Sequence, residues 1–259
     1  MKSRQEIKAI ARLAIGEQRA TGIATLVLVA VASYAGTLFN YVPGGYLGVL
    51  LVGASMFFVD YPMGVNSSGI FIKLYKGEEA SAAELFTNLR VNYMRKVGGS
   101  AWMWLFIYLW MMVVFVPAFF LITGPTHSHV GGVIIFLLAI PVFYKVICYS
   151  FTGHILADCL HVPARHALKL SIRMTAGYRL ALFVMYLSFI GWFGICAFGI
   201  FMAYRFNMSL GVIAVAIFVF VFVGPYINAT LAGYYVELRE KALETGAIAH
   251  EEIWPWVHQ

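Results

Sequence analysis

The sequence predicts an all-α, polytopic membrane protein with six transmembrane helices, arranged as three hairpins that are each preceded by an amphipathic surface helix. The 259 residues are 61% hydrophobic and only 12% charged, with a mean hydropathy of +0.81. Soluble domains carry about 25% charged residues, so this composition excludes an ordinary soluble protein. Six apolar stretches also reach the roughly 20 residues that a helix needs to cross the hydrocarbon core of a bilayer.

The six stretches are joined in pairs by short links. Their predicted bounds are 21–39, 44–64, 99–123, 131–151, 180–204 and 209–231. Short links join antiparallel neighbours, and those within the pairs are residues 40–43, 124–130 and 205–208. We therefore expect one membrane domain, made of an amphipathic N-terminal helix (1–20), a six-helix bundle (21–231) and a cytoplasmic tail (232–259).

The first 20 residues have the pattern of an amphipathic helix. Ser3 and Glu6 fit a capping box, which predicts that the helix begins at this point. The following apolar residues share one face: Ile7, Ile10, Leu13 and Ala14. Lys8 and Arg12 fall on another face, which predicts a helix lying on the membrane surface; the alternative is a solvated, frayed terminus. Because charges are spread through this stretch, we expect no cleavable signal peptide.

Lysine and arginine are concentrated on one side of the predicted bundle. Of the 18 such residues, all but Lys145 and Arg205 fall in the segments 2–19, 73–96, 165–179 and 239–241. The positive-inside rule makes this side cytoplasmic, with both termini, in a multi-pass protein of the cell membrane. The formal charge of +6 is expected to face anionic lipid rather than nucleic acid.

A threefold repeat is visible in the order of these elements. A basic amphipathic segment precedes each hairpin, and Pro163 stands where the third such helix should begin. The second helix of each hairpin contains an internal proline: Pro62, Pro141 and Pro225. Proline kinks a helix and frees a carbonyl, and broken helices often mark transporter sites. We interpret the chain as three units of surface helix, straight span and kinked span, with converging kinks; the alternative is that prolines are simply frequent in membrane helices.

Two charges fall within the predicted spans. Asp60 and Lys145 lie in the cytoplasmic halves of the second and fourth spans, where an isolated charge costs a few kcal/mol. We expect them to approach each other inside the bundle. Asn66, Tyr226 and Asn228 would lie at similar depth and complete a polar cavity beside the kinks. The alternative is that each charge reaches the headgroups separately.

The segment after the fourth span contains weak metal-ligand candidates. His154, Asp158 and His161 would share one face of a continuous helix, and zinc sites use histidine and carboxylate. A solvated helix end beside the membrane is the favoured reading, so we expect no metal or other cofactor. The sequence contains no Walker A, G-x-S-x-G or H-E-x-x-H pattern, and its three cysteines have no paired spacing. No catalytic residue is therefore assigned.

Five segments carry a family resemblance: Met1–Lys8 with Ala11-Arg12, Lys145 with Tyr149-Ser150, Ile155–Asp158, Ala167-Leu168 with Ser171, and Leu187–Trp192. Together they resemble an uncharacterised bacterial integral membrane family, domain of unknown function 975, over most of the chain. The resemblance implies a bacterial cytoplasmic-membrane protein and no particular activity. Distantly similar membrane domains accompany glycerophosphodiester phosphodiesterases, which points toward lipid or envelope work. The chain departs from the family where Cys159-Leu160-His161 replaces an Asn-Pro pair, so we expect the helix to continue there.

Three classes of function follow from these patterns. The first is a transport-like or accessory protein that handles a lipid or small amphipathic substrate in an intramembrane cavity. The second is a membrane-embedded enzyme acting on a lipid-linked substrate, with Asp60, His154, Asp158 and His161 as candidates. The third is an interaction scaffold with a basic surface. The expected partners are membrane lipids, anionic at the cytoplasmic face, and a second copy of the chain or another membrane protein.

Overall fold

The protein is predominantly helical in the part that the structure describes. The computed structural model covers residues 2–43, 45–123 and 129–253, and it contains no strand within these ranges. Six helical stretches there are long and apolar enough to cross a membrane, as expected for a multi-pass membrane protein. They are Arg19–Tyr41, Tyr46–Lys76, Tyr93–Leu121, Gly132–Asp158, Arg179–Arg205 and Ser209–Glu244. The predicted all-α class and the six stretches are thereby confirmed.

Several of these stretches consist of more than one helical element. In chain order the elements are α1 (Arg4–Glu17), α2 (Arg19–Thr37), η1 (Leu38–Tyr41), α3 (Tyr46–Ser55), η2 (Met56–Asp60), α4 (Tyr61–Lys76), α5 (Glu84–Thr87), α6 (Tyr93–Thr123), α7 (His129–Tyr149), α8 (Thr152–Asp158), α9 (Ala164–Met174), α10 (Arg179–Leu187), α11 (Ile190–Arg205), α12 (Ser209–Phe218), η3 (Val219–Val223), α13 (Gly224–Glu244) and α14 (His250–Ile253). The segment η1 is a 3₁₀-helix, whereas η2 and η3 are π-helical.

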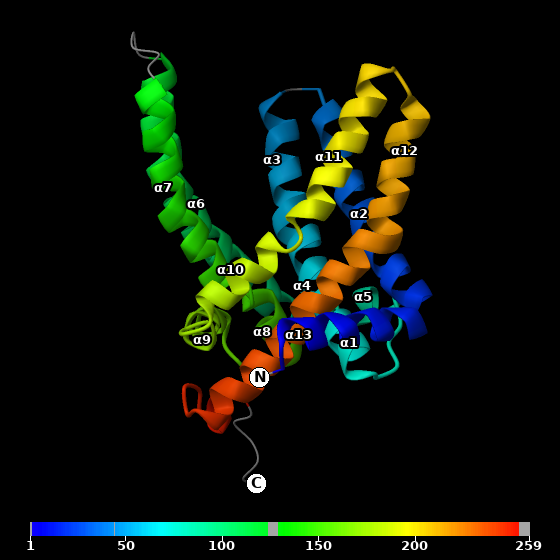
Figure 1. Ribbon diagram of the computed structural model, residues 1–259, viewed down its shortest axis with the longest axis vertical. Coiled ribbons are helices and arrows are strands. Elements are labelled where there is room, and N and C mark those ends of the chain that lie inside the picture. Colours follow the sequence, from blue (N-terminus) through cyan, green and yellow to red (C-terminus); the bar gives the residue numbers. More distant parts are fainter. Residues whose placement is uncertain (1, 44, 124–128, 254–259) are drawn as a thin grey trace.

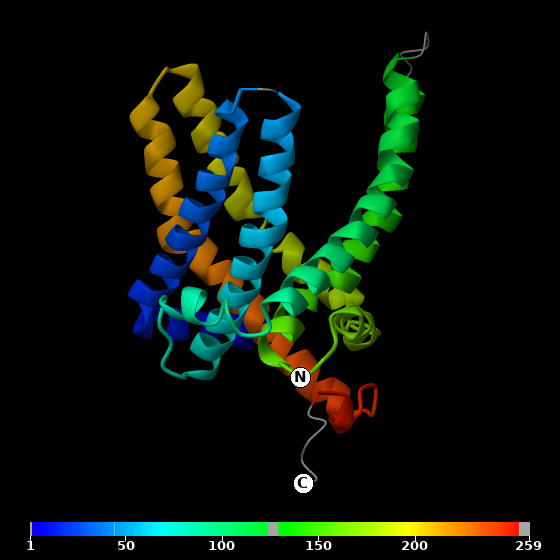
Figure 2. The same cartoon turned by 180° about the vertical axis from the view of Figure 1, so that it is seen from behind.

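Consecutive long helices lie side by side. Figure 1 shows α2 beside α3, α6 beside α7, and α11 beside α12. The first and third of these pairs stand together, whereas α6 and α7 diverge from them (Figure 2). The shorter helices α1, α5 and α9 lie at one end of the long helices, where α4, α8 and α13 also end (Figure 1). We call this end, where α1 and α9 carry their lysines and arginines, the basic end.

Burial is concentrated at the basic end. One large cluster of buried apolar residues joins α1, α4, α8, α9 and α13, and it includes Ile7, Phe71, Leu156 and Tyr235. The long helices beyond this cluster expose large apolar side chains, such as Phe136 on α7, which is 69% exposed. Lipid tails solvate such side chains as well as other protein does, so these regions need no protein partner. The units are therefore held together at the basic end rather than along the whole length of the spans.

The N-terminal helix α1 packs onto this core. The Ser3 N–H donates to a Glu6 carboxylate oxygen at 2.7 Å, and the Glu6 N–H donates to the Ser3 hydroxyl at 3.3 Å, which confirms the capping box. Ile7, Ala11 and Ala14 are buried, whereas Leu13 is 70% exposed. The buried face of α1 therefore includes Ala11 and not Leu13, so the predicted apolar face is rotated from the observed one. The small alanines let α1 approach α13 and α4 closely.

The prolines of the second and sixth spans are each preceded by a π-helical segment. Both η2 and η3 end immediately before the turn that holds the proline, at Pro62 and Pro225 respectively. A proline lacks an N–H and crowds the carbonyl four residues earlier, and the wider π turn gives it room. Pro62 deprives the Phe58 carbonyl of its helical donor, and the Tyr93 hydroxyl donates to that carbonyl instead. Pro62 and Pro225 are buried but Pro141 is exposed on α7, so the predicted convergence of three kinks is wrong.

Two predicted boundaries also change. The fifth span is interrupted between Leu187 and Ile190, so it is not the straight helix that we expected. The sixth span does not end at residue 231, because α13 continues to Glu244 and its residues 232–239 are buried. The segment assigned as a cytoplasmic tail (232–259) therefore begins inside the core; residues 254–259 lie outside the described ranges. The polar sequence of this segment resembles a solvated tail, but Glu237 pairs with Lys2 and Arg239 pairs with Asp158.

Candidate functional site

Asp60 is the last residue of the π segment η2, within the second span. Its Oδ1 atom is buried and has no hydrogen-bond partner among the described residues. The adjacent Tyr61 ring packs edge-on against Phe57 at 5.2 Å and stacks on Trp104 of α6 at 5.4 Å between ring centroids. A buried oxygen without a donor is uncommon in proteins and requires an explanation. Asp60 therefore offers an acceptor next in the chain to a residue that packs in an aromatic cluster.

Lys145 does not pair with Asp60. Its Nζ atom lies over the Trp110 ring, 5.1 Å from the centroid, and no ion pair joins it to Asp60 in the described part of the chain. The helix that carries Lys145, α7, packs against α6, α9 and α10, whereas η2 packs against α2, α3, α4 and α6. The predicted meeting of the two charges is wrong, since an aromatic face satisfies the lysine within its own helix pair.

Asn66 serves a different part of the protein. Its amide nitrogen donates to the Leu85 carbonyl at 2.8 Å, and its oxygen accepts from Lys96 Nζ at 2.6 Å. Lys96 is 2% exposed and also donates to the Asn88 carbonyl at 2.6 Å. Asn66 therefore ties α5 and the start of α6 to α4. Burial of Lys96 was not predicted, because a lysine in a basic segment resembles a surface residue.

Asn228 and Tyr226 complete the predicted cavity residues, and they too have separate partners. The Asn228 side chain donates to the carbonyl of Gly224 at 2.9 Å, within the same helix. Gly224 is the residue before Pro225. Tyr226 packs edge-on against Phe189 at 5.8 Å and lies beneath the Arg12 guanidinium, which is 5.3 Å from its centroid. The five residues predicted to line one cavity therefore have separate partners and do not form one cluster.

Basic residues of α1 and α2 cover aromatic rings of the fifth and sixth spans. Lys8 Nζ lies 4.6 Å from the Phe189 centroid and donates to the Ser188 hydroxyl at 2.6 Å, at the interruption between α10 and α11. Arg19 lies 4.7 Å from the Phe222 centroid, beside η3. Burial lowers the pKa of Lys8, and the charges of Arg4 and Arg12 lower it further. These contacts attach α1 to the interruption of the fifth span and α2 to the π segment of the sixth span.

Asp158 is the centre of a polar cluster that joins three long helices. The Tyr235 hydroxyl donates to its Oδ2 atom at 2.8 Å, and the Arg239 guanidinium forms an ion pair with the same oxygen. Lys76 Nζ lies 3.7 Å from Oδ1. Asp158 ends α8, Lys76 ends α4, and Tyr235 and Arg239 belong to α13, so one carboxylate joins the second span of all three units. Tyr235 and Arg239 were not predicted as site residues, because both fall in the segment assigned as a tail (232–259).

The helix before this cluster stops at Asp158. Arg95 of α6 donates to the carbonyls of Leu156 at 3.0 Å and Leu160 at 3.2 Å, and also to that of Cys159. A cation on the last carbonyls of a helix satisfies them and stabilises the C-terminal end. The expected continuation of the helix through Cys159-Leu160-His161 is therefore wrong.

The three metal-ligand candidates consequently do not share a helix face. His154 is buried with its ring 5.5 Å from the Tyr235 ring, Asp158 is held by cations, and His161 lies beyond the helix end. Within the described residues, no group of three His, Cys, Asp or Glu side chains is placed to hold a metal ion. His154 Nδ1 is buried without a hydrogen-bond partner there.

The reactivity of the Cys159 thiol can be measured, and it shows whether this residue is an activated nucleophile. Burial raises the pKa of its thiol to about 11, and the charge of Asp158 contributes. Only the thiolate is a nucleophile, so in a Cys148→Ser, Cys196→Ser background we expect iodoacetamide at pH 7.5 to modify folded Cys159 about 100-fold more slowly than a free cysteine. The rate should rise as the pH approaches 11 and become normal in SDS. The modification is followed by mass spectrometry. Equal rates in the folded and SDS-unfolded protein would contradict the raised pKa of Cys159.

Comparison with known protein families gives a match over most of the chain. A family model described as a protein of unknown function (DUF975) matches residues 1–242. No curated protein and no solved structure matches the chain.

Proposed function

Since the chain belongs to the DUF975 family, a family of unknown function, we propose its function from its own residues. The protein is a bacterial cytoplasmic-membrane protein of transport-like or accessory type, and it handles a lipid or a small amphipathic molecule at an intramembrane polar site around Asp60. Three helical hairpins, each introduced by a surface helix, cross the membrane. The basic end and both termini face the cytoplasm, as the distribution of lysine and arginine predicts.

One observation carries this proposal: the buried, unpartnered oxygen of Asp60. An ionisable residue in a spanning helix is costly and is by default a functional-site hypothesis. Asp60 also ends a π segment, and single π turns within α-helices are frequent at functional sites. A proton, an amine or a hydroxyl of a bound molecule would supply the donor that Oδ1 lacks.

The surroundings of Asp60 favour an amphipathic molecule. Tyr61, which follows Asp60 in the chain, packs against the rings of Phe57 and Trp104, and ligand sites commonly combine apolar surface with few polar groups. Trp104 belongs to α6, whose outer part carries exposed apolar residues such as Phe115 and diverges with α7 from the other spans (Figure 1). A molecule dissolved in the bilayer would therefore approach this side of the protein without crossing the packed basic end.

The test is the substitution Asp60→Asn, with Glu78→Gln at an exposed position outside the long apolar helices as the control. Protein purified in mild detergent is examined by native mass spectrometry for a co-purified lipid or small molecule. The same variants are reconstituted in vesicles, and transbilayer movement of fluorescent phosphatidylglycerol is followed by dithionite quenching. A hydrogen bond to a charged group contributes about 1.5–3 kcal/mol, so Asp60→Asn should lower occupancy and rate by about 10- to 100-fold.

The control variant and the melting temperature separate this result from misfolding. Glu78→Gln should behave as the wild type, and Asp60→Asn should keep its melting temperature, because no internal hydrogen bond to Oδ1 is lost. A wild type that neither retains a molecule nor moves the lipid would sink the proposal. So would an Asp60→Asn variant that equals the wild type in both measurements.

A further inference from the structure

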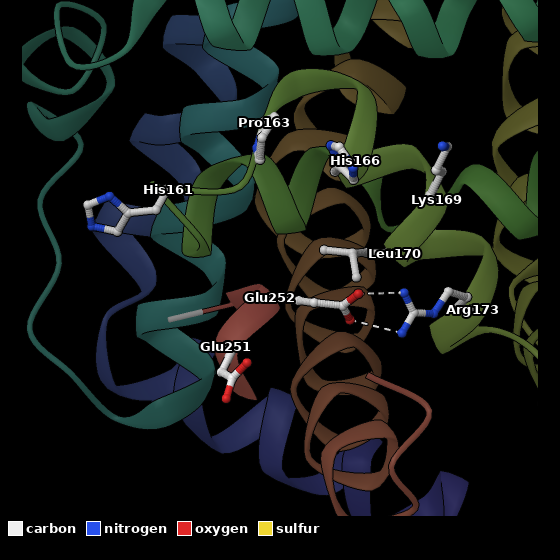
Figure 3. Close-up of a pocket in the computed structure, with 8 residues that line it drawn as sticks. All are labelled: His161, Pro163, His166, Lys169, Leu170, Arg173, Glu251 and Glu252. Atoms are coloured by element: carbon white, nitrogen blue, oxygen red, sulfur yellow. Dashed lines mark hydrogen bonds and ion pairs between the residues drawn. The ribbon is translucent and has the colours of Figure 1, made fainter. Parts of the chain in front are cut away.

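A pocket of about 470 Å³ lies at the basic end, between α9, the turn before it and α14 (Figure 3). It is lined by His161, Pro163, His166, Lys169, Leu170, Arg173, Glu251 and Glu252. Its volume falls within the range of about 300–1,000 Å³ that is typical of small-molecule sites. None of these residues belongs to the long apolar helices, so the pocket is separate from Asp60.

The helix α9 provides a row of nitrogen-bearing side chains. His166, Lys169 and Arg173 are spaced at i, i+3 and i+7, which places them on one face of the helix (Figure 3). Buried residues of the opposite face, among them Ala167 and Met174, fix α9 to the core. The row is therefore held on a rigid element. The side chains of His166 and Lys169 make no hydrogen bond or ion pair with the described residues.

Arg173 already binds an oxyanion of the protein itself. Its Nη1 and Nη2 atoms each donate to a carboxylate oxygen of Glu252, both at 2.9 Å, and its Nε atom donates to the Ala247 carbonyl at 3.0 Å. The hydrogen bonds from Arg173 hold the pKa of Glu252 below its usual range. The planar fork of a guanidinium binds carboxylate and phosphate with the same geometry. Glu252 thus occupies the position in which a phosphate group would be recognised.

We propose that this pocket binds a phosphate group, as a phospholipid headgroup or as a soluble phosphate compound, and that Glu252 competes with it for Arg173. Exchange of one oxyanion for the other keeps the two charge-assisted hydrogen bonds of Arg173. Lys169 and His166 add donors that the carboxylate does not use. Glu252 lies on the four-residue helix α14, so its release changes only a short segment next to the buried Ile248 and Ile253.

The position of α9 connects the pocket with the membrane boundary. Arg165, in the first turn of α9, lies over the ring of Trp102, 4.8 Å from its centroid, and Trp102 belongs to the third span. A lipid headgroup at this level is therefore one source of the phosphate, and a soluble phosphate compound is the other source. The proposal for this pocket does not depend on the function proposed for Asp60.

The experiment measures binding to the full chain in detergent micelles by isothermal titration calorimetry. The probes are inorganic phosphate, glycerol 3-phosphate and dioctanoyl-phosphatidylglycerol. Lys169→Gln should weaken binding about tenfold, whereas Glu252→Gln should strengthen it because Arg173 is released. Lys241→Gln removes a basic residue that is paired with Glu244 outside the pocket, and it should leave binding unchanged. Asp60→Asn should also leave it unchanged.

The outcomes decide both the site and the source of the phosphate. Saturation by the dioctanoyl lipid alone identifies a headgroup site, whereas equal binding of glycerol 3-phosphate identifies a site for soluble phosphates. Lys169 makes no hydrogen bond or ion pair with the described residues, so its variant tests the site without disturbing the attachment of α14. Absence of binding by every probe would overturn the proposal. An equal weakening by Lys169→Gln and Lys241→Gln would also overturn it, since it would show a general basic surface.

Discussion

Substitution of Asp158 by asparagine is expected to lower the free energy of unfolding by about 3–5 kcal/mol, the usual cost of removing one partner from a buried ion pair. The side chains of Asp158 and Arg239 are only 14% and 10% exposed, and Lys76 adds a second cation nearby. Asparagine still accepts a hydrogen bond from Tyr235, so the loss reports the charge. The measurement is chemical or thermal unfolding in detergent micelles.

A matched control lies on the same helix as Arg239. Glu244 forms an ion pair with Lys241 on α13, but its side chain is 66% exposed. Exposed pairs contribute little, so Glu244→Gln should change stability by less than about 1 kcal/mol. The double variant Asp158→Asn, Arg239→Gln should recover part of the loss, because it removes the buried cation together with its partner. Equal effects of Asp158→Asn and Glu244→Gln would refute the central role of the Asp158 cluster.

Substitution of Gly233 by valine is expected to be the second most damaging change. Gly233 is buried on α13, and a Cβ atom there would lie 2.7 Å from Tyr75 Cζ and 2.9 Å from Ile7 Cγ2. Overpacking of this kind costs about 1–3 kcal/mol. Because Ile7 belongs to α1, the substitution should also loosen that helix from the core. Limited proteolysis at the lysines and arginines of α1 measures the loosening, and thermal unfolding measures the cost.

Gly64→Ala is the control for this prediction. Gly64 lies in α4, and a Cβ atom there would meet nothing within 4 Å. Alanine favours a helix over glycine by about 1 kcal/mol, so this variant should be neutral or stabilised. If Gly233→Val melted like the wild type, with α1 still protected from protease, the close packing of α1 on α13 would be disproved.

The polar residues show where sequence reasoning failed. Asp60 and Lys145 were expected to meet because both are costly in lipid, yet Lys145 lies over Trp110 and Asp60 ends a π segment. Depth in the membrane follows from position in the chain, but the direction in which a side chain points depends on the rotation of its helix. Each π segment changes that rotation, and the prolines that follow the two segments predicted kinks there without predicting the change in rotation. The Asp158 cluster escaped notice for a related reason, since its partners lie far apart in the sequence.

The sequence by itself determined the class of protein, the number of long apolar helices and several helix starts. These depend on local quantities, namely the apolar length that a bilayer requires, the capping box at Ser3 and the proline before α9. Only the tertiary structure decided which helices meet, that α13 continues into the core, and that Asp158 joins three units. Lipid solvates apolar surface all round a helix, so hydrophobic patterning does not specify the contacts between spans. Those contacts depend on small residues such as Gly233 and on pairs of distant charges, which act only when the chain is folded.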